Sequence, residues 1–291
     1  MNVSFASAEP RLEIEEFRLI RDIVNRSSGI CFGDDSQYLV ERRLRDRVAA
    51  LGLGSFAEYH QYLRYHPGAR AELEEAIEAL TLNETYFFRE DYQLRAFKSE
   101  ILPELFERAG GRASGLCVWS AGCSTGEEVY TIAMLILESG LFEGWDVKVF
   151  GNDINRRVLQ HARRGIYGKG AFRVTPDSYR RSFFVERPDG MHVADRVRGM
   201  CHFGHLNLVE DDRIALIGRV DVVFCRNVLI YFDNEARRKV IDRFYERLLP
   251  GGYLLLGHSE SLIHLSTSFE IVHLENDLVY RRPLARPLER P

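Results

Sequence analysis

The sequence predicts an α/β protein in which a small all-helical domain precedes a doubly wound, mostly parallel sheet. Up to about residue 80, apolar residues recur only at helical spacing, and no stretch alternates with period two. After about residue 112, short apolar strands alternate with helices, as in parallel sheets that helices cover on both faces. The segment 168–205 breaks this rhythm with glycine, proline and short alternating pieces, which predicts a small β-rich insertion.

Helical patterns fill the first 80 residues. Gly29 and Gly52 end the first two apolar stripes, in a position where glycine often terminates a helix. Ser55 and Glu58 have the spacing of a capping box at the start of a third helix. The apolar stripes consist of Phe17, Ile20 and Val24; of Val40, Leu44, Val48 and Leu51; and of Leu73, Ile77 and Leu80.

Strand–helix units are expected in the second part of the chain. The predicted strands are GLCVWSAG (115–122), VKVFGND (147–153), VDVVFCRN (220–227) and PGGYLLLG (250–257). The predicted helices are 126–140, 155–164 and 234–249. Their alternation along the chain is the pattern that builds a parallel sheet.

Composition and charge exclude several classes of protein. A net charge of −4 gives no whole-molecule attraction to nucleic acid or to an anionic membrane. No apolar run approaches the roughly 18 residues of a membrane span, and the N-terminus lacks the regions of a secretory signal. The five cysteines form no CxxC pair, which is typical of reduced thiols in the cytoplasm. The stretch CHFGH (201–205) resembles a pair of metal ligands, but no further cluster of cysteine and histidine completes a tetrahedral set, so no metal is expected.

The stretch VWSAGCSTGEEVY (118–130) runs from a strand through a loop of small residues into a helix. Gly122 and Gly126 let the backbone approach a ligand, as in the nucleotide sites of doubly wound folds, but the spacing is neither GxGxxG nor a P-loop. Glu127 and Glu128 would repel a diphosphate and attract a cation, which favours S-adenosylmethionine over NAD or ATP. The alternative is an ordinary strand–helix turn whose acids complement the helix dipole.

Polar residues also follow two further predicted strands. Asp153 ends the second strand, where an acid accepts hydrogen bonds from ribose hydroxyls. A helix cap is the alternative for Asp153, although Asn155 can fill that position. Arg226 and Asn227 end a predicted central strand, and Tyr231 follows at the lip of the site. A buried arginine there needs a polar partner, whereas a loop arginine would extend into solvent.

Several stretches, in this order, resemble the CheR family of chemoreceptor protein-glutamate methyltransferases. They are TLNETYFFRE, VWSAGCSTGEEVYTIAML, GNDIN, HLNL, FCRNVLIYFD and LLPGGYLLLGHSES, and the resemblance covers residues 12–282. It implies a Rossmann-like methyltransferase sheet with a small β-subdomain insertion, and S-adenosylmethionine as the cofactor, with S-adenosylhomocysteine as product. The domains implied are 1–80, helical and receptor-docking; 81–111, a linker that closes over the cofactor; and 112–291, the methyltransferase domain.

The resemblance also implies which residues form the site. Arg89 and Tyr231 would hold the substrate carboxylate, and the aromatics at 86–88 would seat the linker between the domains. A glutamate carboxylate is already ionised at pH 7, so methyl transfer to it requires no general base. Glu127 stays an alternative to Glu128 as the acid that binds the cofactor. The implied cofactor contacts are Asn83, Thr85, Arg89, Glu128, Asp153, Asn207, Leu208, Arg226 and Asn227, to which the glycine loop itself adds Gly122.

A basic helix in the first domain is the implied docking face for the cytoplasmic domain of a chemoreceptor. Arg42 and Arg45 of ERRLRDRV project away from its apolar stripe, although a plain solvated helix is the alternative. No determinant for tethering to a receptor C-terminus can be matched in 187–203. Two other functions stay open: methylation of another protein or a small carboxylate, and a non-catalytic S-adenosylmethionine-binding regulatory module. The glycine spacing and the two acids beside the loop exclude an NAD-linked dehydrogenase.

Overall fold

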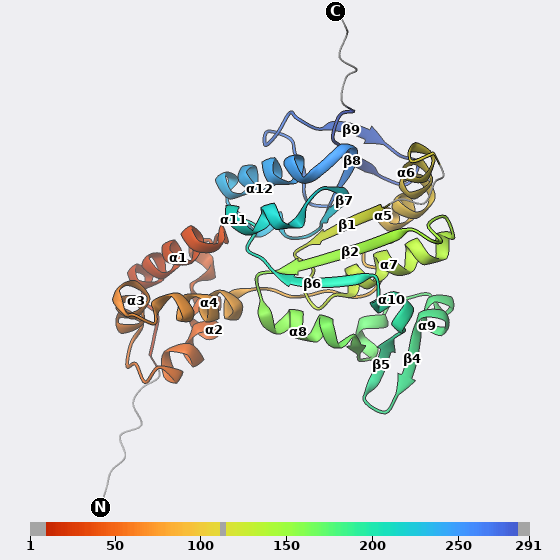
Figure 1. Cartoon of the computed structure of the whole chain (residues 1–291). Helices are drawn as coiled ribbons and strands as arrows, with labels where there is room; N and C mark the ends of the chain where they lie inside the picture. The colour runs from red at the N-terminus through yellow and green to blue at the C-terminus, as the bar shows by residue number, and fades with distance from the viewer. Residues whose placement is uncertain (1–9, 111–114, 285–291) are drawn as a thin grey trace, which may run out of the picture. The chain divides into compact units, whose positions relative to one another are not determined.

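The chain folds as two units that meet in sequence between Leu82 and Asn83. Figure 1 shows the computed structural model, which describes residues 10–110 and 115–284. Among these residues, no helix combines the length and the apolarity that crossing a membrane requires.

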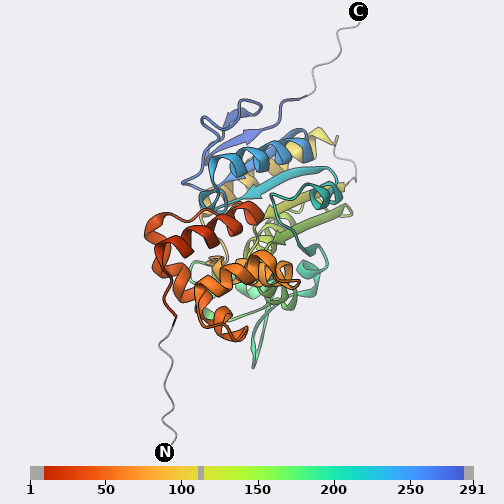
Figure 2. The same cartoon turned by 90° about the vertical axis from the view of Figure 1, so that its left-hand side faces the viewer.

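Four α-helices and one short 3-10 turn make up the described part of unit 1, coloured red to orange in Figure 2. They are α1 (Ile14–Ser28), η1 (Asp34–Ser36), α2 (Gln37–Ala50), α3 (Phe56–Tyr65) and α4 (Ala69–Leu80). Gly29 caps α1 with a φ of 73°, and the Ser55 side chain accepts the N–H of Glu58 at the start of α3, both as predicted. The predicted apolar stripes are buried, except that Leu51 and Leu73 are only half-buried.

A buried ion pair joins three of these helices. Glu72 of α4 is 4% exposed, and its carboxylate accepts hydrogen bonds from Arg47 of α2 (2.5 Å) and from the hydroxyl of Tyr59 of α3 (2.7 Å). Burial, followed by the hydrogen bond to Glu72, raises the pKa of Tyr59. Arg43, also on α2, donates to the carbonyl of Leu80 and so caps the end of α4. Arg43 and Arg47 therefore hold the helical unit together.

In residues 115–284, seven strands form the sheet at the centre of unit 2 (Figure 1). The strands are β1 (Gly115–Ala121), β2 (Asp146–Asp153), β6 (Cys201–His205), β7 (Val220–Cys225), β8 (Leu248–Leu256), β9 (Glu270–His273) and β10 (Leu278–Arg281). Their order is β6–β2–β1–β7–β8–β10–β9, with β10 antiparallel to both neighbours and the first five strands parallel. The predicted mostly parallel sheet is confirmed. The strand order switches between β1 and β7, the place where doubly wound folds bind ligands.

Helices cover both faces of this sheet. The main helical elements are α5 (Asp91–Ala96), η2 (Phe97–Ile101), α6 (Leu102–Arg108), α7 (Glu127–Ser139), α8 (Arg156–Arg164) and α12 (Asn234–Arg247), with short turns at α11 (Asp211–Ile214), η4 (Ala215–Ile217) and η5 (Leu229–Tyr231). Trp119 of β1 packs edge-on against Phe244 of α12, whereas Phe224 of β7 packs against Phe97 of η2. Because Trp119 pairs with Val223 in the sheet, the rings of Trp119 and Phe224 point to opposite faces.

The connection before the sheet is mostly helical. Residues 91–108 lie inside the predicted linker of 81–111, yet they form α5, η2 and α6. Leu94, Phe97 and Ile101 are buried in the core of unit 2. The shorter segment 83–90 contains neither helix nor strand. That the connection closes over a cofactor stays a prediction.

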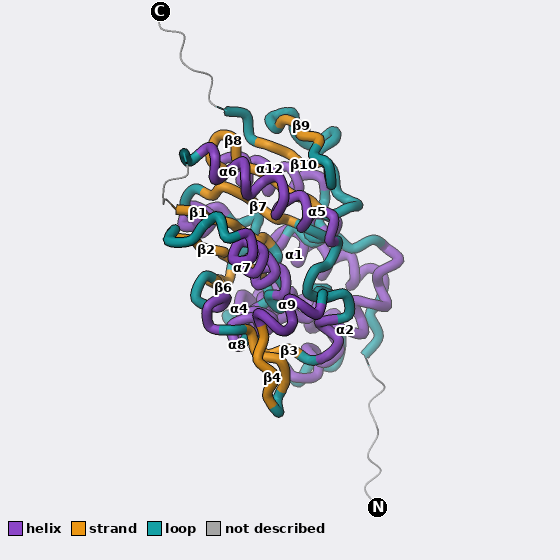
Figure 3. The backbone as a smooth tube through the Cα atoms, turned by 90° about the vertical axis from the view of Figure 1, so that its right-hand side faces the viewer, coloured by secondary structure: helices purple, strands orange, loops and turns teal. Residues whose placement is uncertain are grey.

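A small antiparallel sheet is inserted between α8 and β6, as predicted. Its order is β3–β5–β4, and it lies apart from the main sheet in Figure 3. The inserted elements are β3 (Ile166–Tyr167), η3 (Lys169–Phe172), α9 (Asp177–Phe183), β4 (Phe184–Arg187), β5 (Gly190–Val193) and α10 (Asp195–Arg198). The predicted range of 168–205 extends too far, because residues 201–205 pair with β2 as a parallel strand of the main sheet.

Phe87 anchors the segment before α5 to this insertion. Its ring is fully buried and packs against Tyr167, Phe172 and Phe184 at centroid distances of 4.8 to 5.0 Å. Phe88 is also buried and packs against α9. Both rings belong to the interior of unit 2, so the expectation that they seat the segment between the domains is wrong for these two residues.

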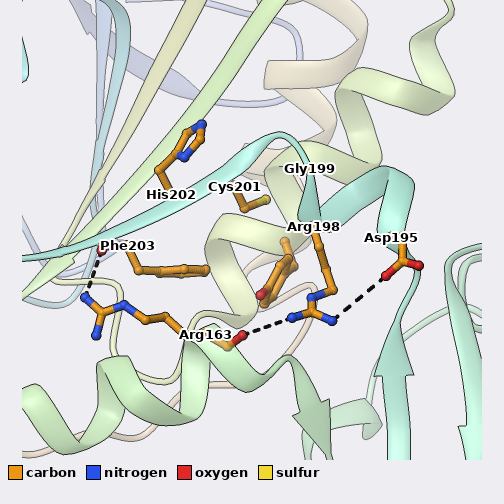
Figure 4. Close-up of a pocket in the computed structure, with 8 residues that line it drawn as sticks. Arg163, Asp195, Arg198, Gly199, Cys201, His202 and Phe203 are labelled. Atoms are coloured by element: carbon orange, nitrogen blue, oxygen red, sulfur yellow. Dashed lines mark hydrogen bonds and ion pairs between the residues drawn. The ribbon is translucent and has the colours of Figure 1, made fainter.

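A surface hollow of about 620 Å³ lies beside the first residues of β6 (Figure 4). Arg163 of α8 donates to the carbonyl of Phe203 (2.9 Å), and Arg198 of α10 donates to the carbonyl of Arg163 (3.3 Å) and approaches Asp195. These bonds join α8, α10 and β6, so the two arginines brace the insertion against the sheet. The hollow lies at the amino end of β6, whereas doubly wound folds bind their ligands at the carboxyl ends of strands.

Candidate active site at the carboxyl ends of the parallel strands

The loop after β1 forms the first part of the site. Gly122 and Gly126 have φ values of 77° and 94°, a region that glycine adopts without steric cost. A Cβ at Gly122 would lie 2.4 Å from Cγ2 of Val228, so the loops after β1 and β7 touch at this glycine. The N–H groups of Gly122 and Cys123 both donate to the carbonyl of Asn152, which ties the loop to the end of β2. The contact of Gly122 with a cofactor stays a prediction.

Glu127 and Glu128 open α7 but face different partners. Glu128 accepts the hydroxyl of Ser120 (2.7 Å) and an N–H of Arg226 (3.2 Å). Glu127 is 4% exposed and accepts the hydroxyl of Thr125 (2.7 Å). Burial raises the pKa of both carboxyls, and for Glu128 the charge of Arg226 opposes that rise. Of the two acids, Glu128 is the one that contacts another predicted site residue.

Arg226 is the central cation of the site. Its side chain is 3% exposed and pairs with Glu90 and Glu128 at 3.2 Å each. It also donates to the carbonyl of Arg89 (2.5 Å), while its Nε has no hydrogen-bond partner among the described residues. The predicted polar partner is thus present, and the alternative of an arginine extending into solvent is wrong. When both acids are ionised, this cluster of Glu90, Glu128 and Arg226, the acidic cluster, has a net negative charge, and Arg89 approaches Glu90 at its edge (3.9 Å).

Glu90 is the member of the acidic cluster that no pattern singled out. Its carboxylate also accepts the side-chain amide of Asn227 (3.3 Å), the hydroxyl of Tyr92 (3.4 Å) and a backbone hydrogen bond from His258. Burial opposes ionisation of Glu90, but the charge of Arg226 and the hydrogen bonds from Asn227 and Arg226 outweigh it, so its pKa lies below the usual value. Glu90 is therefore ionised at neutral pH and orients both Arg226 and Asn227.

Asp153 ends β2 beside the glycine loop. One carboxylate oxygen accepts the N–H of Ser124 (2.9 Å), and the other accepts the N–H of Asn155 (2.9 Å). Asn155 itself caps α8 by accepting the N–H groups of Arg157 and Val158. The helix therefore has its cap without Asp153, which excludes the helix-cap alternative, and the carboxylate of Asp153 instead joins the glycine loop to the end of β2. Binding of a ribose by Asp153 stays a prediction.

The segment before α5 runs past the glycine loop. The carbonyl of Asn83 accepts the hydroxyl of Ser124 (3.0 Å), and Thr85 is half-buried. Arg89 is 29% exposed, and its guanidinium donates to the carbonyl of Glu84 within the same segment (2.9 Å). Asn83 is thus next to the loop after β1. Arg89 is next to the loop after β7, because its carbonyl accepts a hydrogen bond from Arg226.

The remaining predicted residues follow β6 and β7. Asn207 and Leu208 are buried just after β6, and the carbonyl of Leu208 accepts a hydrogen bond from Arg243 of α12 (2.5 Å). Tyr231 ends η5 in the loop after β7 and is half-buried. The structure therefore brings the predicted residues of unit 2 to the carboxyl ends of β1, β2, β6 and β7 and to the segment before α5.

Backbone strain gathers in the same segments. The non-glycine residues with positive φ in the described part of the chain are Phe88 (61°), Glu90 (52°), Ser124 (49°), Asn227 (57°) and His264 (63°). All but His264 belong to the segment before α5 or to the loops after β1 and β7. Such conformations cost on the order of 1–3 kcal/mol and cluster at functional sites. This strain marks the site independently of any sequence motif.

Two family models together span most of the chain. Residues 15–81 match the all-alpha domain of CheR methyltransferases, and residues 83–278 match their S-adenosylmethionine-binding domain. The chain belongs to the CheR methyltransferase family. It is accordingly a methyltransferase that depends on S-adenosylmethionine.

This CheR-family enzyme is also similar to several curated relatives. It is 37% identical to "Chemotaxis protein methyltransferase 2" of Vibrio cholerae serotype O1, over 92% of this chain and 93% of the relative. It is 35% identical to "Chemotaxis protein methyltransferase 1" of Pseudomonas aeruginosa, over 91% of this chain and 97% of the relative. A solved magnesium protoporphyrin IX methyltransferase from Synechocystis PCC 6803 with bound S-adenosylmethionine is 16% identical, with a TM-score of 0.34, over 84% of this chain and 97% of that one. So distant a likeness says nothing about the site.

The sequence patterns did not single out three residues at this site: Glu90, Ser120 and Glu260, whose carboxylate accepts the N–H groups of Asn227 and Val228. Glu90 and Glu260 stand in TLNETYFFRE and LLPGGYLLLGHSES, two stretches that carry the family resemblance. Their position in these stretches was a signal, but their partners lie far away in sequence. Ser120 alternates with the apolar residues of β1, and only the structure shows its bond to Glu128.

Proposed function

We propose that this enzyme methylates glutamate side chains on the cytoplasmic domain of a chemoreceptor and produces glutamate methyl esters. Relatives named chemotaxis protein methyltransferases support a role in chemotaxis. The observation that carries the proposal is the acidic cluster at the switch point of the sheet, in a chain that matches both CheR family domains. We place the reaction in the cytoplasm, and the five free cysteines accord with a reducing compartment.

The residues at the site fit a cationic cofactor. S-adenosylmethionine has a sulfonium and an ammonium against one carboxylate, so its net positive charge complements the acidic cluster. The buried Nε of Arg226 lacks a partner among the described residues, and a ligand carboxylate is a group that would satisfy it. When bound, the cofactor supplies an electrophilic methyl group. The residues proposed to hold it are Asn83, Thr85, Arg89, Gly122, Glu128, Asp153, Asn207, Leu208, Arg226 and Asn227.

A glutamate substrate brings its own nucleophile. Its carboxylate has a pKa of about 4.3 and is ionised at neutral pH, so the enzyme needs no general base. The protein's task is to orient the carboxylate in line with the methyl group and to exclude water from it. We assign this task to Arg89 and Tyr231. The guanidinium of Arg89 is partly exposed and can meet a substrate from solvent, whereas Arg226 is buried among its partners.

We propose that Arg42 and Arg45 of α2 dock the receptor. Arg42 is exposed, and Arg45 is 32% exposed and pairs with Glu41 (2.8 Å) on the same helix. Arg43 and Arg47 instead bind partners within unit 1. The basic helix thus has a structural pair and a surface pair, and glutamate-rich receptor helices have the charge that would complement the surface pair.

Charge reversal tests this docking surface. Arg42→Glu and Arg45→Glu should raise the KM for a receptor fragment and leave the affinity for S-adenosylmethionine unchanged. Arg70→Glu is the matched control, because Arg70 is an exposed arginine on another helix of the same unit. If the KM moves equally in all three variants, or in none, the docking surface is not on α2.

The reaction itself is tested with methyl-labelled S-adenosylmethionine and a receptor cytoplasmic fragment. Methyl esters release methanol in base, whereas N-methyl groups do not, so base-labile label on the receptor supports glutamate methylation. Label that resists base would refute it. Label found only on a small acid or on another protein would favour the alternative that the enzyme methylates that acceptor and not a receptor. Binding of the cofactor with no transfer to any acceptor would favour a regulatory module.

A further inference from the structure

Four backbone N–H groups converge on the carboxylate of Glu260. One oxygen accepts from Gly257 (2.7 Å) and Asn227 (2.8 Å), and the other accepts from Val228 (2.9 Å) and Ile230 (3.1 Å). Glu260 and Gly257 follow β8, whereas the other three donors lie in the loop after β7. One side chain therefore joins the loops that leave two neighbouring strands of the sheet.

The two loops approach each other closely. A Cβ at Gly257 would lie 2.7 Å from the backbone nitrogen of Asn227, which leaves no room for a larger residue. The next residue, His258, donates its backbone N–H to Glu90, the acid that also binds Arg226 and Asn227. The loop after β8 thus contacts both the loop after β7 and the acidic cluster.

The loop after β7 depends on an outside acceptor. Asn227 has a φ of 57°, a left-handed conformation that few residues other than glycine, asparagine and aspartate adopt. The N–H groups of Asn227, Val228 and Ile230 donate to Glu260, and an ionised carboxylate has the lone pairs to accept several donors at once. The same loop begins with Arg226 and contains Tyr231. Hydrogen bonds to Glu260 thus fix the backbone of this loop.

We propose that Glu260 is a positioning residue for methyl transfer. Its carboxylate fixes the backbone of residues 227–230 and so holds Asn227 and Tyr231 in the geometry that binds the cofactor and the substrate. Glu260 acts through this backbone and is not itself a catalytic residue. The inference rests on the proposed function of Asn227 and Tyr231. The competing explanation is that Glu260 contributes stability alone.

Glu260→Gln separates the two explanations. The substitution replaces one acceptor oxygen by an amide that is itself a donor, so the N–H groups facing it lose their acceptor. Glu100→Gln is the matched control, because Glu100 accepts the N–H groups of Glu275 (2.7 Å) and Asn276 (3.3 Å) in another loop of unit 2. For each variant, the Tm, the Kd for S-adenosylmethionine by calorimetry, and the kcat and KM with a receptor fragment are measured.

We expect both variants to lower the Tm, while only Glu260→Gln weakens cofactor binding and lowers kcat, each by about tenfold. If Glu260→Gln matches Glu100→Gln in cofactor affinity and kcat, the role is structural and the proposal is overturned. Should Glu260→Gln fail to fold, Glu260→Asp keeps the charge on a shorter arm and is expected to weaken cofactor binding several-fold. Unchanged affinity in Glu260→Asp would likewise overturn the proposal.

The calorimetric measurement also distinguishes this inference from the proposed function. It requires the cofactor but no receptor. A wild-type protein that binds S-adenosylmethionine but methylates no receptor refutes the proposed substrate and leaves the comparison of Glu260 with Glu100 decisive. A wild-type protein that binds no S-adenosylmethionine overturns both.

Discussion

Replacing Arg226 with methionine should destabilise unit 2 in a pH-dependent way. Methionine fills much of the same space but removes the cation that pairs with Glu90 and Glu128. Removing one partner of a buried ion pair costs about 3–5 kcal/mol, since the other charge stays buried. The two carboxylates are 19% and 17% exposed and keep their bonds from Asn227 and Ser120. We therefore expect the lower end of the range, about 3 kcal/mol.

This loss has a predictable temperature and pH signature. At about 2–4 °C per kcal/mol for a unit of this size, the Tm near pH 7 should fall by about 6–12 °C. Burial raises the pKa of Glu128 above the usual 4.5, so this carboxyl contributes its full stability below pH 4.5 and loses it as the pH rises. Without Arg226 that loss is larger. The lowered pKa of Glu90 has the opposite sign: its stabilisation exists above 4.5 and is lost as the pH falls. Both effects make the deficit of the variant shrink on acidification.

Thermal unfolding followed by circular dichroism at several pH values measures this deficit. Arg219→Met is the control, because Arg219 precedes β7 and donates to the carbonyls of Glu246 and Leu248, so its removal leaves no carboxylate without a counter-charge. Its Tm shift should be smaller and independent of pH. A Tm for Arg226→Met within a degree of wild type at pH 7, or a deficit that grows on acidification, would refute the pairing described for the acidic cluster.

Further predictions address packing and catalysis. Gly122→Ala forces a side chain into a backbone with a φ of 77° and should lower stability by at least about 1 kcal/mol in urea unfolding; a neutral effect would contradict the tight loop contact. Arg47→Ala leaves Glu72 buried without its cation and should cost unit 1 about 3 kcal/mol, while an unchanged urea midpoint would speak against that pair. Arg89→Ala should lower kcat/KM for methylation at least about tenfold, and Tyr231→Phe less, since charge-assisted hydrogen bonds are stronger; the reverse order would exclude the assigned roles.

Much of the fold was predictable because its central elements are apolar and sharply bounded. The strand predicted at 115–122 is β1 (Gly115–Ala121), and the helix predicted at 234–249 is α12 (Asn234–Arg247). The strands that the sequence did not reveal are β6, β9 and β10. Of the residues in β9 (Glu270–His273), none is buried, so no apolar alternation marks it. β6 and β9 are the edge strands of the sheet, and such strands are defined by the neighbour with which they pair, which is information that is not local in the sequence.

The site shows the same limit at the level of single residues. Asp153 and Arg226 could be placed because strand–helix topology brings the carboxyl ends of parallel strands to one edge of the sheet. Glu90 and Glu260 could not be assigned partners, because Glu90 binds Arg226 and Glu260 binds backbone N–H groups of a loop after a different strand. When a carboxylate accepts backbone N–H groups, the sequence contains no complementary side chain that would indicate the contact.

The positions of the tryptophans make fluorescence a probe of unit 2 alone. The chain has two tryptophans, Trp119 and Trp145, and both lie in unit 2. Trp119 is fully buried and donates a hydrogen bond to the side chain of Asn152 (2.6 Å), so its fluorescence emission changes when unit 2 unfolds. Unit 1 is helical in its described part and has no tryptophan, so it contributes to far-ultraviolet dichroism and not to that emission. Comparing the two signals in one denaturant titration of the unlabelled protein therefore reveals whether the units unfold together or in sequence.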